Sequence, residues 1–269
     1  MLVAHGATNS GFAADDRILL GEGLFETLKV ERSKPCFAEL HWLRLSDSAR
    51  KLGITFELSF GAWLDCLNQK IHQDGLFQGG IKAILSGGVA ARGLAEHGQM
   101  SQLMLQTFAY THQHEPIRLM SASWLRDPAN PIYQHKSVNY LEAILARRQA
   151  LAGGMDDTLF FNSLHHASET TCANLFLIKD EVLYTPPLTD GVLPGITRRR
   201  ILSLCADRRL ACREQSLTGS MLAAADAVFI TNALQNIRLV RSIDAVSFKL
   251  EHLLIDRLVQ ELTPLDTSA

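Results

Sequence analysis

The chain has 269 residues, of which 47% are hydrophobic and 20% are charged, and its formal net charge is −2. This length allows one large domain or two modest ones with a substantial apolar core, without disulfides or a structural metal. The net charge is near zero and Lys and Arg are dispersed, so the basic footprint of a nucleic-acid-binding protein is missing. Charged residues also interrupt every apolar run before it reaches membrane-spanning length. We therefore expect neither nucleic-acid nor membrane binding.

Cysteine and histidine spacing gives no sign of disulfides or metal. The five cysteines form no Cys-x-x-Cys pair, and an odd number is typical of a reducing compartment. His112-x-His114 and His165-His166 have no cysteine or carboxylate partners at a metal-binding spacing. The sequence therefore predicts a cytoplasmic protein without a bound metal, in which the first histidine group belongs to a linker and the second to a turn.

Strand-like and helix-like segments alternate in the first part of the chain. Alternating apolar and polar residues indicate a strand after the turn signal Gly21-Glu22-Gly23, and Gly53 provides a helix stop. Four glycines lie in residues 86–100, which we expect to form a loop. We predict strands at residues 24–30, 81–85 and 102–110, and helices at residues 41–52 and 60–72.

The same mixture continues after a linker-like segment, residues 112–116. We predict strands at residues 117–124, 158–161, 174–178 and 227–231, and helices at residues 139–151, 197–204 and 220–225. The fold class is therefore α/β (mixed α+β), with two domains. The expected organisation is a smaller N-terminal α/β domain (1–112), a linker (113–118) and a larger C-terminal domain (119–269).

Two charged residues of the second part are candidates for chemistry. Lys136 lies just ahead of the helix expected at residues 139–151, and a lysine becomes nucleophilic when burial or a neighbouring cation lowers its pKa. Glu169 lies in a small-residue stretch, where a carboxylate could pair with a protonated ring nitrogen. Taken singly, a solvated lysine and an exposed turn glutamate are the more frequent cases.

Two further segments are candidates for anion binding. In Leu193-Pro-Gly-Ile-Thr-Arg198, a Pro-Gly turn leads into a helix, whose free N–H groups and dipole favour an anion. Thr197 could donate to a phosphate oxygen or simply cap the helix. Thr231 and Asn232 end a buried strand, where ligand contacts are common, but an Asn-stabilised turn also fits.

In this order and spacing, the segments resemble the fold-type IV family of pyridoxal-phosphate (PLP) enzymes. The family contains branched-chain aminotransferases, D-amino-acid aminotransferases and 4-amino-4-deoxychorismate lyases. The resemblance runs from Asp16-Arg17 to about Asp244, and it rests on these motifs: Gly21-Glu-Gly-Leu-Phe-Glu-Thr27, His41-x-x-Arg-Leu45, His135-Lys-Ser-Val-Asn-Tyr-Leu-Glu142, Ser168-Glu169, Asn174-Leu-Phe176, Tyr184-Thr-Pro-Pro187, Leu193-Pro-Gly-Ile-Thr-Arg198 and Thr231-Asn232. It implies a two-domain fold like that of D-amino-acid aminotransferases and a homodimer that acts on a small-molecule substrate.

The resemblance also implies roles for individual residues. Lys136 would hold PLP as a Schiff base and act as general base and acid. Glu169 would pair with the pyridine nitrogen and keep the ring an electron sink. The cofactor phosphate would be bound by Arg44, Ile196, Thr197, Thr231 and Asn232.

Among the subfamilies, the chain is most similar to the aminodeoxychorismate lyases. The similarity lies in Gly-Leu-Phe-Glu-Thr27, in Thr231-Asn-Ala-Leu-Gln235 and in the glycine-rich loop. It implies production of 4-aminobenzoate and pyruvate in folate biosynthesis. Arg92 is the candidate ligand for a substrate carboxylate, although a glycine-flanked surface arginine fits equally. The other candidates for substrate contact are Phe25, Thr27 and Tyr140.

Two alternatives remain at this stage. Lys-Ser-x-Asn139 is close to the pattern of D-amino-acid aminotransferases, so an aminotransferase acting on D- or branched-chain amino acids is the first. The second is a non-catalytic protein that binds a phosphate or cofactor, because Gly87 stands where many relatives carry an arginine. Glu22 replaces the more usual Asp of the Gly-x-Gly turn, and we expect no consequence from this change.

Overall fold

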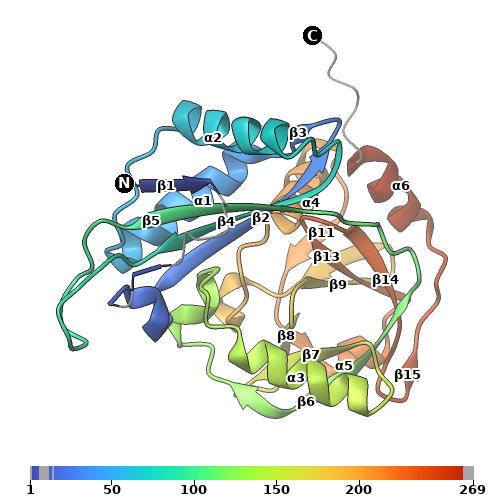
Figure 1. Cartoon of the computed structure of the whole chain (residues 1–269). Coiled ribbons are helices and arrows are strands. Elements are labelled where there is room, and N and C mark those ends of the chain that lie inside the picture. Colours follow the sequence, from blue (N-terminus) through green and yellow to red (C-terminus); the bar gives the residue numbers. More distant parts are fainter. Residues whose placement is uncertain (1, 6–11, 14, 263–269) are drawn as a thin grey trace. The chain divides into compact units, whose positions relative to one another are not determined.

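The computed structural model describes residues 2–5, 12–13 and 15–262, and the chain divides into two compact units (Figure 1). The first unit comprises Met1–His112 and His135–Tyr140, and the second comprises Gln113–Gln134 and Leu141–Ala269. This division differs from the expected one in a short segment: the residues around Lys136 group with the first unit. The first strand of the second unit begins at Ile117, inside the range expected for the linker.

The first unit contains a five-stranded sheet in the order β1-β5-β4-β2-β3. Its strands are β1 (Leu2–His5), β2 (Gly23–Glu31), β3 (Lys34–Pro35), β4 (Gln78–Ser86) and β5 (Gln102–Phe108), and its α-helices are α1 (Ala38–Leu52) and α2 (Phe60–Gln73). Strands β1 and β5 are parallel, and the other neighbours are antiparallel. A short 3-10 helix, η1 (Arg17–Leu20), precedes β2.

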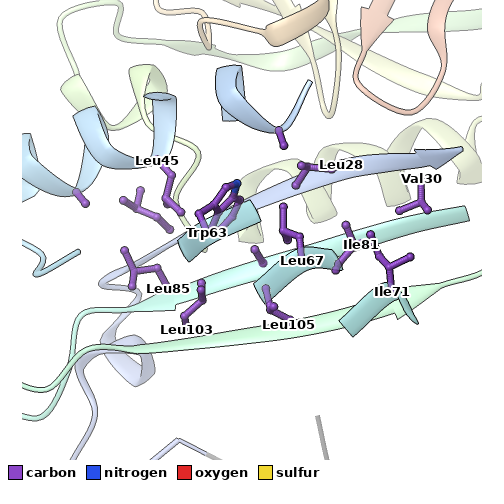
Figure 2. Close-up of a cluster of buried hydrophobic side chains, with 14 of the residues drawn as sticks. Leu28, Val30, Leu45, Trp63, Leu67, Ile71, Ile81, Leu85, Leu103 and Leu105 are labelled. Atoms are coloured by element: carbon purple, nitrogen blue, oxygen red, sulfur yellow. The ribbon is translucent and has the colours of Figure 1, made fainter. Parts of the chain in front are cut away.

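One face of this sheet forms a core with α1 and α2 (Figure 2). Alternate residues of the strands, such as Leu28 and Ile81, point into it together with Leu45 of α1. Trp63 of α2 is completely buried there. Ser59 caps α2 by accepting a hydrogen bond from the Ala62 N–H at 3.2 Å. The amphipathic patterns that predicted both helices thus correspond to real burial.

Hydrogen bonds explain why the segment around Lys136 groups with the first unit. The Phe25 N–H donates to the Lys136 carbonyl at 2.9 Å, and the Val138 N–H donates to the Gly23 carbonyl at 3.0 Å. The side chain of Asn139 donates to the Gly21 carbonyl at 2.8 Å. Residues 136–138 therefore extend along the free edge of β2.

The second unit contains a ten-stranded sheet in the order β11-β10-β9-β13-β14-β6-β7-β8-β12, with β15 paired to β14. The strands are β6 (Ile117–Arg126), β7 (Asp157–Asn162), β8 (His166–Thr170), β9 (Asn174–Lys179), β10 (Val182–Thr185), β11 (Cys212–Glu214), β12 (Leu217–Thr218), β13 (Ala227–Asn232), β14 (Asn236–Ile243) and β15 (Val246–Ser247). Because β8 also pairs with β9, part of the sheet closes on itself. The closed part contains β9, β13, β14, β6, β7 and β8.

Four α-helices occur among the described residues of the second unit. They are α3 (Leu141–Ala152), α4 (Ile196–Asp207), α5 (Gly219–Ala223) and α6 (Leu253–Leu262), with the 3-10 turns η2 (Pro131–Gln134) and η3 (Leu188–Asp190). Leu177 and Val228 belong to one hydrophobic cluster, while their strand neighbours Phe176 and Phe229 join a second cluster with α4 and α6. Helix α3 packs on β6 and β7 (Figure 1).

The predicted strands and helices are present with shifted ends. The helix predicted from residue 139 begins at Leu141. The turn prediction for the histidine pair is right for His165, whose φ is 59°, but wrong for His166, which begins β8. The same strand contains Glu169, in a stretch that had turn-like composition. Pairing of β8 with β7, β9 and β12 outweighs the weak local preference of its small polar residues.

The described residues contain neither a membrane-spanning helix nor a metal-binding group of side chains. None of their helices has the length and apolar character needed to cross a bilayer. No three His, Cys, Asp or Glu residues in the described ranges are grouped so that they could hold a metal ion.

Candidate active site

In the first unit, the Lys136 amine lies against two aromatic rings. Its Nζ donates to the Tyr140 hydroxyl at 3.0 Å and lies 4.3 Å from the centroid of the Phe25 ring. The two rings meet edge to face with centroids 5.0 Å apart. The segment that carries Lys136 is fixed further by a 3.0 Å contact between His135 Nδ1 and Ser48 Oγ of α1. The amine is therefore held in one place beside a hydroxyl that can share its proton.

A second lysine, Lys82, lies over the same phenyl ring. Its Nζ is 4.5 Å from the Phe25 centroid, and its backbone is paired with Thr27 across β2 and β4. Burial, and then the charge of Lys136, hold the pKa of the Lys82 amine below its ordinary value. Lys82 is not among the site residues predicted from the sequence. The only available signal was its place on the polar side of the predicted strand at residues 81–85.

Arg44, the predicted phosphate ligand, belongs to a buried cluster on α1 and β2. Its Nε and one Nη donate to the two carboxylate oxygens of Glu26 at 2.8 and 2.6 Å, and His41 Nδ1 lies 2.6 Å from the same carboxylate. Burial alone would raise the pKa of Glu26, but Arg44 and His41 lower it to about 2. Burial lowers the pKa of His41. Glu26 therefore stays ionised and fixes the plane of the Arg44 guanidinium.

The remaining substrate candidates of the first unit differ in exposure. Phe25 is buried and Thr27 is half-buried, whereas Arg92 is exposed in the glycine-rich loop. A Cβ at Gly87 would lie 2.7 Å from the Glu22 carbonyl oxygen. A larger residue at position 87 would therefore collide with the Glu22 backbone in this conformation, which explains the glycine there.

In the second unit, Glu169 is held by donors from several directions. The Leu193 N–H donates to its Oε2 at 3.0 Å and Asn174 Nδ2 donates to the same oxygen at 3.3 Å. On the other side, Arg126 Nη1 lies 3.4 Å from Oε1. Since Leu193 begins the turn that leads into α4, these contacts place the carboxylate beside the start of that helix.

The start of α4 has the features of a phosphate site. Gly195 is its N-cap and supplies no side-chain cap, and a Cβ there would collide with Asn174 Oδ1. The Thr197 hydroxyl donates to the Asn232 carbonyl at 2.9 Å, so the end of β13 lies against this helix end. Next to Asn232, Thr231 is 1% exposed and its Oγ1 has no hydrogen-bond partner within the described part of the chain. A buried hydroxyl without a partner beside an uncapped helix N-terminus fits a phosphate group.

The side chain of Asn232 stabilises a turn. Its Oδ1 accepts hydrogen bonds from the Leu234 N–H at 3.1 Å and the Gln235 N–H at 2.9 Å. This is the arrangement expected for an Asn-stabilised turn after a strand. The Asn232 carbonyl also accepts the hydrogen bond from the Thr197 hydroxyl, so its backbone contacts the start of α4.

The first unit holds a fixed lysine amine, and the second holds a half-buried carboxylate and a helix end whose features fit a phosphate group. PLP-dependent enzymes use groups of these kinds. The amino-transferase class IV family matches residues 23–243, so the chain belongs to this family, whose members use PLP.

Individual relatives include both lyases and aminotransferases. A Legionella pneumophila structure, provisionally named a 4-amino-4-deoxychorismate lyase, is 58% identical and covers 97% of each chain with a TM-score of 0.95. The 4-amino-4-deoxychorismate lyase of Pseudomonas aeruginosa is 27% identical over 94% of each chain, with a TM-score of 0.83. The branched-chain-amino-acid aminotransferase of Escherichia coli K12 is 30% identical over 77% of this chain and 70% of its own. These likenesses confirm the mixed α/β, fold-type IV architecture.

Proposed function

We propose that the protein is a PLP-dependent 4-amino-4-deoxychorismate lyase, which forms 4-aminobenzoate and pyruvate for folate biosynthesis. The observation that carries this proposal is the 58% identity to the provisionally named Legionella lyase over 97% of both chains. The Pseudomonas lyase supports it as well, since its match covers 94% of each chain.

The proposal assigns a cofactor role to seven individual residues. Lys136 is the residue that binds PLP covalently, and Glu169 pairs with its ring nitrogen. The buried hydroxyl of Thr231, which has no hydrogen-bond partner among the residues that the structure describes, supports a phosphate at the start of α4. The phosphate ligands are Arg44, Ile196, Thr197, Thr231 and Asn232.

The chemistry follows from proton transfer at one carbon. When bound, PLP withdraws electrons from the carbon that carries the substrate amino group. The Lys136 amine removes the proton from that ring carbon, and the Tyr140 hydroxyl at 3.0 Å keeps the amine oriented for the transfer. Loss of the proton and of the enolpyruvyl oxygen makes the ring aromatic. The released enolpyruvate takes up a proton and becomes pyruvate. The other residues that the proposal assigns to the substrate are Arg92, Phe25 and Thr27.

The direct test supplies freshly prepared 4-amino-4-deoxychorismate to the PLP-loaded protein. We expect 4-aminobenzoate and pyruvate in equal amounts, measured by fluorescence and by a lactate dehydrogenase assay. A PLP-loaded protein that releases neither product would exclude the lyase.

An aminotransferase is the second candidate function. The E. coli branched-chain enzyme and the D-alanine aminotransferase of Bacillus licheniformis, which is 28% identical over 236 residues, favour it. Incubation with leucine or D-alanine and 2-oxoglutarate distinguishes the two functions. Formation of glutamate without 4-aminobenzoate release in the lyase assay would assign the protein to the aminotransferases.

Lys82 is expected to bind a carboxylate of the substrate. Its amine lies over the same ring as the Lys136 amine, and the substrate carries two carboxylates. We expect Lys82→Met to raise KM about tenfold and to change kcat little, because a hydrogen bond to a charged group contributes about 1.5–3 kcal/mol. Lys82→Arg, which keeps the charge, should recover part of the loss. An unchanged KM in Lys82→Met would show that this amine does not contact substrate.

We also propose that the protein is a cytoplasmic homodimer. Helix α3 exposes Leu141, Ile144 and Leu145, which follow helical spacing and form an apolar strip on its surface. Sedimentation velocity should give about twice the monomer mass. Leu145→Glu, which introduces a charge into the strip, should shift the protein toward monomer. A native protein that sediments as a monomer at all concentrations would contradict the proposal.

A further inference from the structure

Arg126 is a buried cation that lies between two carboxylates of the second unit. It ends β6, is 6% exposed, and its Nη1 lies 3.4 Å from Glu169 Oε1. Its Nε and Nη2 both lie 3.0 Å from Oε2 of Glu142, in the first turn of α3. The guanidinium carbon lies 3.4 Å from the ring centroid of Phe160 and 4.7 Å from that of Tyr133. Neither Arg126 nor Glu142 has a role in the function proposed above.

These contacts leave the guanidinium a single position. The rings of Phe160 and Tyr133 restrict it in one direction, and the bonds to Glu142 fix its rotation in the plane. Glu142 is itself held, because Trp124 Nε1 donates to its Oε1 at 2.9 Å. Trp124 and Arg126 are two residues apart on β6, so both reach the same carboxylate from one side of the strand.

The fixed guanidinium of Arg126 restricts the carboxylate of Glu169. Its Oε2 accepts hydrogen bonds from the Leu193 N–H and from Asn174, while Arg126 contacts the other oxygen. A carboxylate with donors on both oxygens cannot rotate freely.

We propose that Arg126, anchored by Glu142, is a positioning residue that holds the Glu169 carboxylate in place for the ring nitrogen of PLP. The inference rests on the proposed function, in which Glu169 pairs with that nitrogen. The inference adds a chain of hydrogen bonds that supports Glu169 and runs from Trp124 through Glu142 to Arg126.

The test compares the dissociation constants of PLP and of 1-deaza-PLP, in which a C–H group replaces the ring nitrogen. Arg126→Met keeps an unbranched apolar side chain between the two rings. We expect it to weaken PLP binding about tenfold and to change 1-deaza-PLP binding less than about twofold, because only PLP uses the Glu169 contact. Equal weakening of both ligands, or no change in either, would overturn the proposal.

Two further variants complete the experiment. Glu142→Gln keeps the size of its side chain and removes the anchoring charge, so it should weaken PLP selectively in the same direction, and it decides the question if Arg126→Met does not fold. Glu169→Gln tests the proposed function itself. If Glu169→Gln does not distinguish PLP from 1-deaza-PLP, the assignment of Glu169 is wrong. If it does and the Arg126 and Glu142 variants do not, only the positioning role is wrong.

Discussion

Lys136→Ala is expected to reduce release of 4-aminobenzoate and pyruvate at least about a thousandfold, because both covalent attachment of the cofactor and proton transfer are lost. The backbone around residue 136 is held by hydrogen bonds of Phe25 and Val138 to main-chain groups, and these do not involve the lysine side chain. The variant should therefore fold, and its unfolding temperature should remain close to that of the native protein. Rates are measured by following both products with PLP in excess.

Lys29→Ala is the matched control, since Lys29 lies on β2 of the same sheet and pairs with Glu31 on its own strand. It should keep full activity. Borohydride reduction of the native PLP-loaded protein, followed by peptide mapping, should label Lys136 alone. Activity of Lys136→Ala within tenfold of native, or a label on another lysine, would contradict the role given to Lys136.

The sequence predicted those parts of the fold whose pattern is local. Residues 24–30 place Leu24, Leu28 and Val30 at even-numbered positions, and in the structure these three side chains of β2 lie in the core. The helix predicted at 60–72 has its apolar residues on one face and a serine cap, and α2 covers the same residues. Strand β8 lacks such a pattern. Its position is set by backbone pairing with β7, β9 and β12 and not by an apolar alternation of its own, so a local pattern could not find it.

Some residues of the candidate site likewise have a local sequence signal, and others do not. Motifs near turns and helix ends, such as the start of α4 at Ile196, carry their own signal of glycine, proline and threonine. By contrast, Lys82 is 54 residues before Lys136 (136 − 82) and meets it only across the ring of Phe25. A lone lysine in a predicted strand gives no indication of such a neighbour.

The position of the Arg126 side chain also depends on the pairing of strands. The register between β6 and β7 shifts between Ser121 and Leu125, a stretch that contains Trp124 and directly precedes Arg126. A shift of this kind changes which side chains share a face, and no local sequence pattern reports it. The carboxylates of Glu142 and Glu169 are brought to one guanidinium by the packing of α3, β6 and β8 together.

Trp63→Ala is expected to lower the free energy of unfolding by about 3–5 kcal/mol, the range for removing a large aromatic side chain from a core. Trp63 is 0% exposed, and its ring meets that of Phe56 edge to face with centroids 6.1 Å apart (Figure 2). The cavity would open between α2 and the core face of the sheet whose β2 strand carries Phe25, so activity should be lost at lower urea concentrations than in the native protein. Urea denaturation followed by circular dichroism measures the change.

Trp63→Phe is the control that separates packing from hydrogen bonding. The indole Nε1 is buried without a hydrogen-bond partner among the described residues, so phenylalanine removes volume but breaks no hydrogen bond. Its cost should therefore be roughly 2 kcal/mol or less. If Trp63→Phe were as destabilising as Trp63→Ala, the loss would come from the indole N–H. That result would contradict the absence of a hydrogen-bond partner for Nε1 among the described residues. A small effect of Trp63→Ala would instead mean that α2 contributes little to the stability of the first unit.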